Sequence, residues 1–204
     1  PNREVDGENT DHPTYHPGAW LAFGDIGGLD VWRNEARVQH RRFSIPPAGG
    51  AGTGSFQVVN AYTSLDGNTA VCEEQCTYTV VAGAQGWFLM SASAFRPTGD
   101  GVAFGDQEEM GFGVRFATGL TVKYGDGHMV NSDGGKDEEG TWGRSAQWCA
   151  GYGAIDGKCA GMMVLTDRAN FRPSWFHSRD YGLIVANPFG KKALTAPKDK
   201  NVVP

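Results

Sequence analysis

One stretch of the sequence organises the fold of this chain: SWFHSRDYGLIVANPFG, residues 174–190. In an extended strand, successive side chains point to opposite faces. One face of this stretch then carries Trp175, His177, Arg179 and Tyr181, and the other carries Phe176, Ser178 and Asp180. The second half is apolar and ends at Asn187-Pro188. The pattern predicts one strand, 175–185, whose polar face lines a cleft. The alternative is a sandwich strand whose polar face meets water.

Length and composition indicate a single globular domain. A chain of 204 residues can bury a sizeable core. Its 20% charged and 11% aromatic residues exclude a disordered protein. The net charge of −5, with acids and bases interleaved, argues against nucleic acid as a partner. No apolar run approaches the roughly 20 residues that a membrane span needs, so we expect a soluble protein.

Short β-prone runs between glycine-rich turns dominate the rest of the chain, which has 30 glycines. Segments such as SLDGN and AIDGK supply the Gly, Asp and Asn residues that tight turns favour. No run shows the 3.6-residue apolar period of a long helix. We therefore predict an all-β, antiparallel fold of two packed sheets with little helix. The expected strands are 20–23, 36–45, 55–63, 70–81, 86–97, 110–117, 146–154, 158–167 and 175–185.

The cysteines and the first residue bear on the compartment. Cys72 and Cys76 lie about 13 Å apart along one predicted strand, too far for a bridge. Cys149 and Cys159 flank a predicted hairpin tip and can meet across it, which predicts a disulfide and an oxidising compartment. The chain begins at Pro1, so we expect either a removed leader or a longer parent protein. A secreted or periplasmic location follows.

Histidines are the candidate acid/base groups. Two lie in DHPTYH, residues 11–16, where Pro13 excludes a helix interior and leaves a loop beside an aromatic run. A third lies in the run 36–43, on the same strand face as Val38. Imidazole exchanges protons near neutral pH, so the candidate catalytic residues are His177, His12, His16 and His40. The alternative is that they are surface, capping or buried structural residues.

The run EEMGFGVRF, residues 108–116, suggests a second part of the site. One face of an extended chain carries Glu109, Gly111, Gly113 and Arg115, and the other is apolar and predicted to be core. The bare backbone at the glycines leaves room for a ligand. The polar loop 131–145 is a candidate rim over this site, and tryptophans would supply flat apolar platforms. The candidate substrate-binding residues are Arg179, Arg115, Glu109, Asn131, Trp20, Trp142 and Trp175.

The usual metal and nucleotide motifs are absent from the sequence. It has no HExxH, no paired CxxC, no Walker loop and no GxGxxG motif. We therefore expect no cofactor and no metal. A metal site assembled from the four candidate histidines stays open as an alternative.

Several motifs together resemble a family of bacterial proteins of uncertain function, labelled PmoA-like or DUF6807. They are DHPTYHPGAWLAFGDIGGLDVWRN, ARVQHRRF, EEMGFGVRFA, NSDGG with WGRSAQW, and NFRPSWFHSRDYGLIVANPFG. The resemblance implies a β-sandwich akin to the galactose-mutarotase supersandwich and an association with sugar catabolism. It also implies further strands before the first motif and after the last. We thus predict that residues 1–204 form a single sandwich domain lacking terminal strands at one or both ends. Many members have histidine where this chain has Tyr15.

Three hypotheses for function follow. The leading one is a carbohydrate-active enzyme, an epimerase, lyase or hydrolase acting on a sugar or oligosaccharide by histidine acid/base chemistry. The second is a non-catalytic structural or carbohydrate-binding subunit of an extracellular assembly, and a homo-oligomer is compatible with either. The third is a histidine-ligated metal oxidoreductase.

Overall fold

The computed structural model describes residues 16–195, which divide into two compact units. Unit 1 comprises the described residues up to Asp25 and from Gly105 onward, and unit 2 is the continuous segment Ile26–Phe104. Unit 2 is thus inserted between two pieces of unit 1 in the sequence. The single-domain arrangement stays a prediction.

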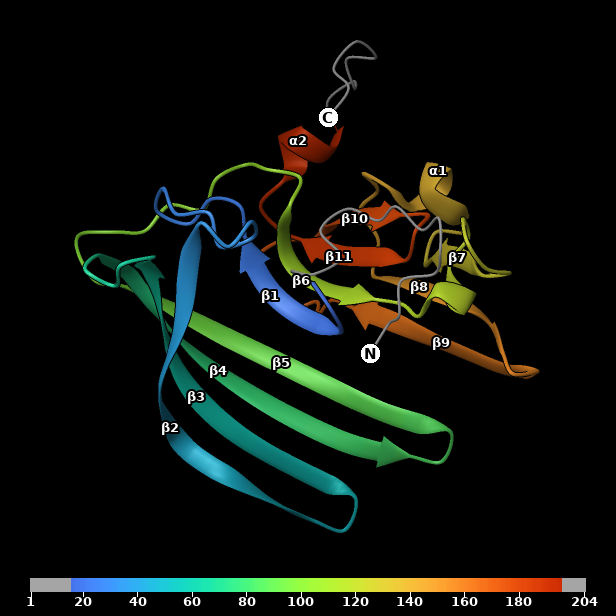
Figure 1. Cartoon of the computed structure of the whole chain (residues 1–204), viewed down its shortest axis with the longest axis horizontal. Coiled ribbons are helices and arrows are strands. Elements are labelled where there is room, and N and C mark those ends of the chain that lie inside the picture. Colours follow the sequence, from blue (N-terminus) through green and yellow to red (C-terminus); the bar gives the residue numbers. More distant parts are fainter. Residues whose placement is uncertain (1–15, 196–204) are drawn as a thin grey trace. The chain divides into compact units, whose positions relative to one another are not determined.

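Unit 1 is a sandwich of two antiparallel sheets. Four strands form one sheet in the order β1-β6-β11-β10, and three form the other in the order β7-β8-β9 (Figure 1). These strands are β1 (Ala19–Phe23), β6 (Met110–Arg115), β7 (His128–Asn131), β8 (Trp148–Ile155), β9 (Lys158–Leu165), β10 (Trp175–Arg179) and β11 (Leu183–Asn187). The helical segments are short: η1 (Thr118–Leu120), α1 (Asp137–Thr141) and α2 (Lys191–Thr195).

The hydrophobic core of unit 1 lies between its two sheets. Apolar side chains from the inward face of the four-stranded sheet meet those of the three-stranded sheet, as the alternation along 110–116 predicts. The buried members of this core are Val114, Phe116, Leu120, Met129, Cys149, Val164, Phe176, Ile184 and Ala186. The other face of the four-stranded sheet is mixed, because it carries charged side chains together with the buried apolar residues Leu183 and Val185.

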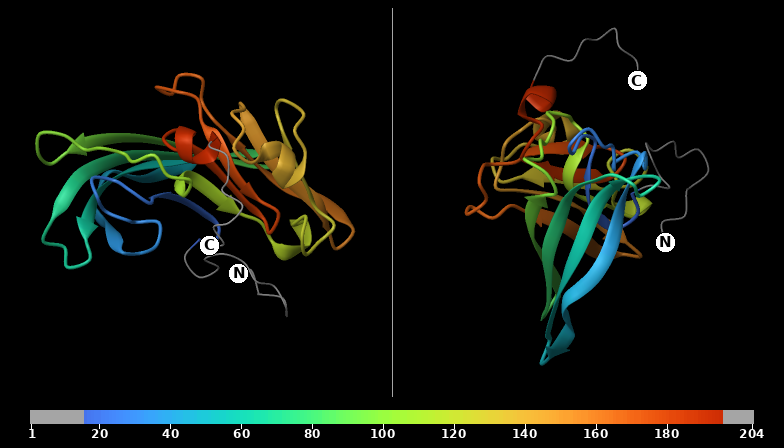
Figure 2. Two further views of the ribbon diagram at one scale, coloured as in Figure 1. Left: turned by 90° about the horizontal axis from the view of Figure 1, so that it is seen from above. Right: turned by 90° about the vertical axis from the view of Figure 1, so that its left-hand side faces the viewer.

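Unit 2 is a meander of four long antiparallel strands. They are β2 (Ala36–Gly50), β3 (Thr53–Ser64), β4 (Ala70–Gly83) and β5 (Gly86–Pro97), paired in sequence order. Figure 2 shows these neighbouring ribbons, coloured blue to green, from two further directions. The β2–β3 pairing contains three register shifts, whereas the β4–β5 pairing is regular over its whole length.

The fold class predicted from the sequence is confirmed: the protein is mostly β, antiparallel and poor in helix. Two details of the strand prediction are wrong. The sequence pattern missed β7, whose four residues lie between glycine-rich turns. The expected single strand 175–185 is a hairpin, because the chain turns at Gly182, where φ is +98°. Glycine adopts this positive φ without the penalty that a side chain would add.

The predicted Cys149–Cys159 disulfide is also wrong. In the β8–β9 register Cys149 lies opposite Val164, and Cys159 lies opposite Ala154. Both thiols are free, and so are those of the other two cysteines. The hairpin is simply not symmetric about the two cysteines, so they cannot face each other. The cysteines therefore give no support for an oxidising compartment.

Among the described residues, no helix is long and apolar enough to cross a membrane.

Candidate functional site

The register of the four-stranded sheet brings several predicted site residues onto one face. Across β1, β6, β11 and β10, Trp20 pairs with Gly113, Gly113 with Val185, and Val185 with His177. In the neighbouring row Arg115 pairs with Leu183, and Leu183 with Arg179. Directly opposed residues share a face of the sheet. His177, Arg179, Arg115 and Trp20 therefore lie on the face directed away from the core.

The glycines of β6 serve packing on this face. A Cβ atom on Gly113 would lie 2.6 Å from two ring atoms of Trp20, so the indole occupies the space above this residue. A Cβ on Gly111 would collide with the Ala186 carbonyl oxygen, and the φ of Gly111 is +119°. The space beside Gly111 and Gly113 is therefore filled by other atoms of the protein. The sequence pattern had suggested that a ligand could occupy it.

Glu108 is the centre of the polar cluster, and the sequence pattern pointed to its neighbour Glu109. The regular strand begins only at Met110, so the alternation of faces does not extend back to these two residues. The Asn187 amide fixes the backbone at Gln107 and Glu108, because Nδ2 donates to the carbonyl oxygens of Gln107 at 2.7 Å and Glu108 at 3.1 Å. In the sequence, the apolar alternation begins at Met110. This is the one sign that Glu108 and Glu109 precede the strand, so that strand periodicity does not tell which of them points into the site.

Three cationic or N–H groups meet the same oxygen of Glu108. Oε1 accepts from the Trp142 indole N–H at 2.9 Å and lies 2.8 Å from His177 Nδ1 and 3.5 Å from an Arg179 guanidinium nitrogen. Within the described residues, no hydrogen bond to the other oxygen, Oε2, is found. The carboxylate can therefore accept one more donor at Oε2.

These contacts keep Glu108 ionised. Burial by itself raises the pKa of Glu108. The hydrogen bond and charge of His177, the Trp142 N–H and the Arg179 charge outweigh burial and lower this pKa from 4.5 to about 2. For the cationic Arg179, burial has the opposite effect and lowers the pKa. The charges of Glu108 and Glu138 outweigh burial and raise the pKa of Arg179 above its usual value. The cluster is therefore a network of permanent charges around one histidine at neutral pH.

Helix α1 holds the far side of the cluster. Glu138 Oε1 accepts from Arg179 at 3.1 Å, and Glu138 Oε2 accepts from the backbone N–H of Asp180 at 2.9 Å. The fully buried hydroxyls of Thr141 and Ser178, 2.7 Å apart, tie the helix to β10. Glu138 belongs to the predicted rim loop 131–145, but nothing in the sequence marked it as the partner of Arg179.

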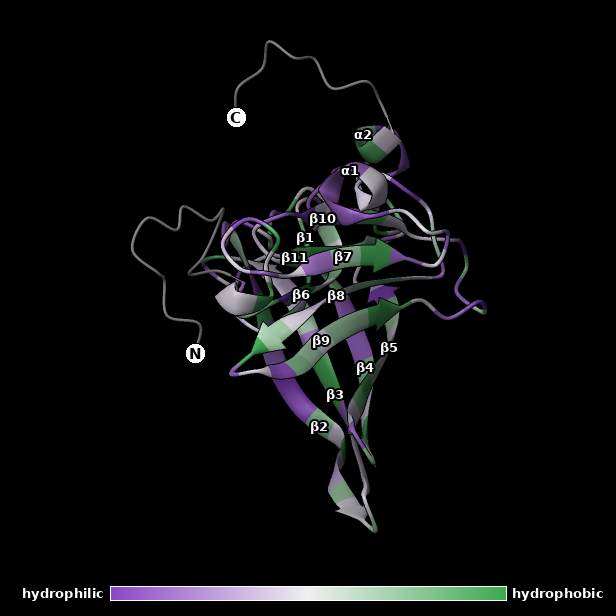
Figure 3. Cartoon of the chain, turned by 90° about the vertical axis from the view of Figure 1, so that its right-hand side faces the viewer, coloured by the Kyte–Doolittle hydropathy of each residue, from purple (hydrophilic) through white to green (hydrophobic). Residues whose placement is uncertain are grey.

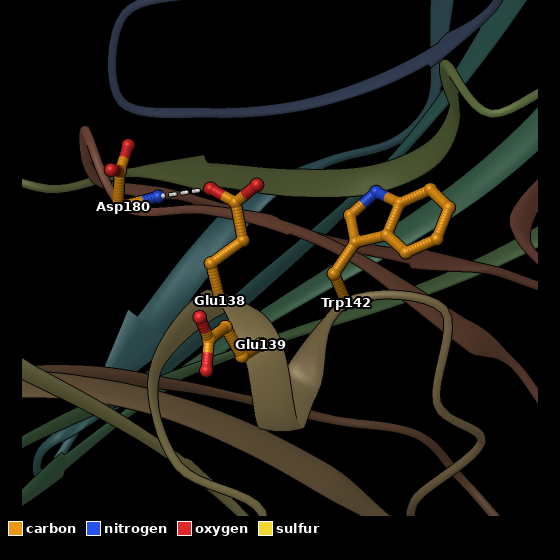
Figure 4. A pocket seen from close by; sticks show the side chains of 4 residues that line it. All are labelled: Glu138, Glu139, Trp142 and Asp180. Carbon is orange, nitrogen blue, oxygen red and sulfur yellow. Dashed lines mark hydrogen bonds between the residues drawn. The ribbon is translucent and has the colours of Figure 1, made fainter. Parts of the chain in front are cut away.

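An open hollow of about 370 Å³ lies beside α1. It is lined by Glu138, Glu139, Trp142 and Asp180. Figure 4 shows the Glu138 carboxylate reaching the Asp180 backbone while the Trp142 indole stands at the end of the helix. The hollow thus combines one large aromatic ring with three carboxylates. His177 and Glu108 do not line it; they are joined to it through the Trp142 N–H.

The other candidate histidines are distributed differently. His16 is buried in unit 1, and its ring centroid lies 4.6 Å from that of Trp20. His40 is an exposed residue of β2 in unit 2, next to Phe43. His12 lies outside the described residues. The structure therefore places His16 and His177 in unit 1, with His177 on β10 and His16 just before β1.

The remaining predicted binding residues have structural partners. The Asn131 side chain accepts from the backbone of Asp133 and Gly135 and donates to Gly140, so it closes the loop before α1. The ring of Trp175 lies 5.5 Å from the Lys191 ammonium group. Glu109 is half-buried, and its carbonyl accepts from Gly24 at 3.0 Å. Their binding roles stay predictions.

Comparison with known proteins adds a family. The model of the DUF6807 family, described as a family of unknown function, matches residues 4–203. The chain belongs to this family. Membership of DUF6807, predicted from the motifs, is thereby confirmed. No curated protein and no solved structure matches the chain. The site of this DUF6807 protein must therefore be interpreted from its own residues.

Proposed function

We propose that this DUF6807 protein is a carbohydrate-active protein of the PmoA-like, mutarotase-like type, secreted or periplasmic. It would act on a sugar or oligosaccharide as an epimerase, lyase or hydrolase through histidine acid/base chemistry. One observation carries the proposal: the ionised Glu108 carboxylate contacts both His177 and Trp142, and Trp142 lines the open hollow. The antiparallel two-sheet sandwich of unit 1 is compatible with the mutarotase-like part of the proposal.

The roles within the cluster follow from its charges. With a pKa of about 2, Glu108 is too weak a base to abstract a proton at neutral pH. Its oxygen at 2.8 Å instead favours the proton on His177 Nδ1, which makes Nε2 the nitrogen that would exchange a proton with substrate. Arg179, held by Glu108 and Glu138, would stabilise negative charge that develops on a substrate oxygen.

The hollow suits a polyol better than an apolar ligand. The Trp142 ring offers a flat apolar surface for the C–H face of a sugar ring. The carboxylates beside it accept hydrogen bonds from hydroxyl groups. The three acids of the lining also disfavour anionic substrates near this wall, which makes neutral sugars the first compounds to test.

A substrate panel with matched variants tests the enzymatic proposal. Neutral sugars, keto-sugars, uronates and disaccharides would be followed by NMR for epimerisation, elimination or hydrolysis. We expect the His177→Gln variant to lose activity at least about 100-fold, the loss typical of a missing acid/base group. His128→Gln is the control, because His128 is exposed in the same unit. Equal rates in wild type and H177Q would eliminate the catalytic role.

The buried position of His177 favours a second candidate, a non-catalytic carbohydrate-binding module. The residue is only 2% exposed and does not line the hollow. A binding module predicts saturable sugar binding without turnover. Binding should fall at least about tenfold in Trp142→Ala, less in Trp142→Phe, and not at all in H177Q. Binding unaffected by W142A would reject the hollow as the sugar site under both candidates.

The metal oxidoreductase hypothesis has no support from the described residues. Within residues 16–195, no three His, Cys, Asp or Glu side chains are grouped so that they could hold a metal ion.

A further inference from the structure

The four-stranded sheet of unit 2 has two very different edges. β2 and β5 each pair on one side only, because the strand order is β2-β3-β4-β5. Each therefore presents a row of backbone N–H and C=O groups that no other strand pairs with in the part of the chain that the structure describes. Such an edge can pair with a strand from another chain unless the sequence protects it. Figure 1 shows the two strands at opposite edges, β2 in blue and β5 in green.

Strand β2 has three common forms of edge protection: charged side chains, prolines and register shifts. It contains Arg37, Arg41 and Arg42, and the two prolines of Pro46-Pro47 have no N–H to donate. The three register shifts against β3 interrupt its regular shape. The basic run appears as a purple band on β2 in Figure 3. Another strand would meet charges, missing donors and bulges along this edge.

Strand β5 has none of these features over ten consecutive residues. The segment 86–95, GWFLMSASAF, contains no charged residue and no proline, and its pairing with β4 shows no register shift. Three large apolar side chains stand out from it: Trp87 is 69% exposed, Phe88 62% and Met90 52%. Ten residues at about 3.3 Å each give an unprotected edge of about 33 Å. A long, regular edge without charges or prolines is a surface with which another strand can pair.

We infer that β5 pairs antiparallel with β5 of a second copy of this chain, so that two four-stranded sheets join into one of eight strands. The edge fits itself because it is uncharged, so two copies meet no like-charge repulsion. A two-fold axis perpendicular to the sheet requires a residue to face its own copy near the centre of the strand, at Ser91 or Ala92. The assembly also closes at two copies, because both outer edges of the joined sheet are then the protected β2 strands.

This inference is independent of the proposed sugar chemistry, because the cluster around Glu108 lies in unit 1. It specifies the homo-oligomer as a dimer and assigns its contact to one strand.

Sedimentation analysis of the whole chain tests the dimer and its contact. We expect wild type to be a dimer at about 100 µM and to dissociate on dilution. Ala92→Lys brings two ammonium groups close together near the axis, directly opposed if Ala92 lies on it and diagonal if Ser91 does, and should weaken dimerisation at least about tenfold. Ala48→Lys is the matched control on β2, where Ala48 is likewise exposed in a strand, and it should leave the dimer unchanged.

The outcomes separate the alternatives. A wild-type monomer at about 100 µM rejects the second copy as the occupant of this edge. If A48K weakens the dimer and A92K does not, the contact lies on β2 and the inference is wrong. If wild type forms assemblies larger than a dimer, closure at two copies is wrong. If circular dichroism shows that A92K does not fold, Ala94→Lys is the second variant, because it places a charge opposite Phe88 or Met90 of the other copy and should also weaken the dimer.

Discussion

At the scale of single residues, the Glu108 carboxylate links β6, β10 and α1 through three contacts on one oxygen. A side chain with this many partners has a pH-dependent effect on stability. The pKa of Glu108 is lowered from 4.5 to about 2 in the folded protein. Its contribution is therefore fully present above about pH 4.5 and is lost as the pH falls toward about 2.

The Glu108→Gln variant should show this loss directly. At neutral pH we expect E108Q to be less stable than wild type by 1 kcal/mol or more, and by about 3 kcal/mol at most, because solvent screens a side chain that is 28% exposed. The difference should shrink as the pH falls from about 4.5 to 2. Urea unfolding at a series of pH values measures it. Parallel stability curves for the two proteins would contradict the charge network.

Gly113 offers a second test at this scale, because its missing side chain makes room for Trp20. We expect Gly113→Ala to destabilise the protein by about 1–3 kcal/mol, since the added Cβ would lie 2.6 Å from the indole ring. Gly86→Ala is the control, because nothing lies within 4 Å of its Cβ position. Thermal unfolding compares the two, and equal melting temperatures would show that the indole moves without cost.

At the scale of elements, the hairpin of β10 and β11 positions the cluster, and its turn depends on Gly182. The φ of Gly182 is +98°, which strains a residue with a side chain, and an added Cβ would also lie 2.6 Å from Thr121 Cγ2. We expect Gly182→Ala to destabilise by about 2 kcal/mol or more, the combined cost of strain and overlap.

Gly157→Ala separates those two costs. Gly157 lies in the β8–β9 turn with a φ of +74° and nothing within 4 Å of its Cβ position. It should therefore lose only the strain component, about 1 kcal/mol. Urea denaturation of both variants gives the comparison, and a larger loss in G157A than in G182A would contradict this account of the turn.

The elements also show how far the sequence could lead. Alternation along 110–116 correctly predicted which face of β6 is core, because a buried face leaves a period of two in the sequence. The same alternation failed across 175–185, since Gly182 reverses the chain inside what reads as one extended run. The alternation also selected Glu109 instead of Glu108 as the site residue. Both glutamates precede Met110, where the strand begins, so their side chains do not follow its alternation.

The partnership of Arg179 with Glu138 was beyond sequence reasoning for a different reason. The two residues are 41 positions apart and meet only because α1 packs against β10. His177 and Arg179, in contrast, were correctly placed on one face, because both belong to the same short strand. Local periodicity was therefore informative within an element and silent about contacts between elements.

At the scale of the whole molecule, the four thiols report on the packing of both units. Cys72 and Cys76 in unit 2 and Cys149 in unit 1 are fully buried, whereas Cys159 is exposed. Burial raises the pKa of Cys72 to about 11 and that of Cys149 to about 12, which keeps both thiols protonated and unreactive.

A thiol-reactive dye should therefore label one cysteine rapidly in the native protein and four after unfolding in denaturant. Cys159→Ser should remove the fast phase without lowering the melting temperature, and a reducing agent should leave that temperature unchanged. Two rapidly reacting thiols in the native protein would show that a buried cysteine is accessible. A melting temperature lowered by reductant would show that a disulfide exists after all.

The insertion of unit 2 into unit 1 has a consequence for the order in which the chain folds. Strand β1 leaves the ribosome before its partner β6, which follows about 90 residues later, so β1 stays unpaired with β6 during that time. The four strands of unit 2 are paired in sequence order and can form in the meantime by successive hairpins. Once formed, unit 2 holds its own ends together through the bridge between Ile26 and Phe104. Folding of the insert thus shortens the loop that β1 and β6 have to close.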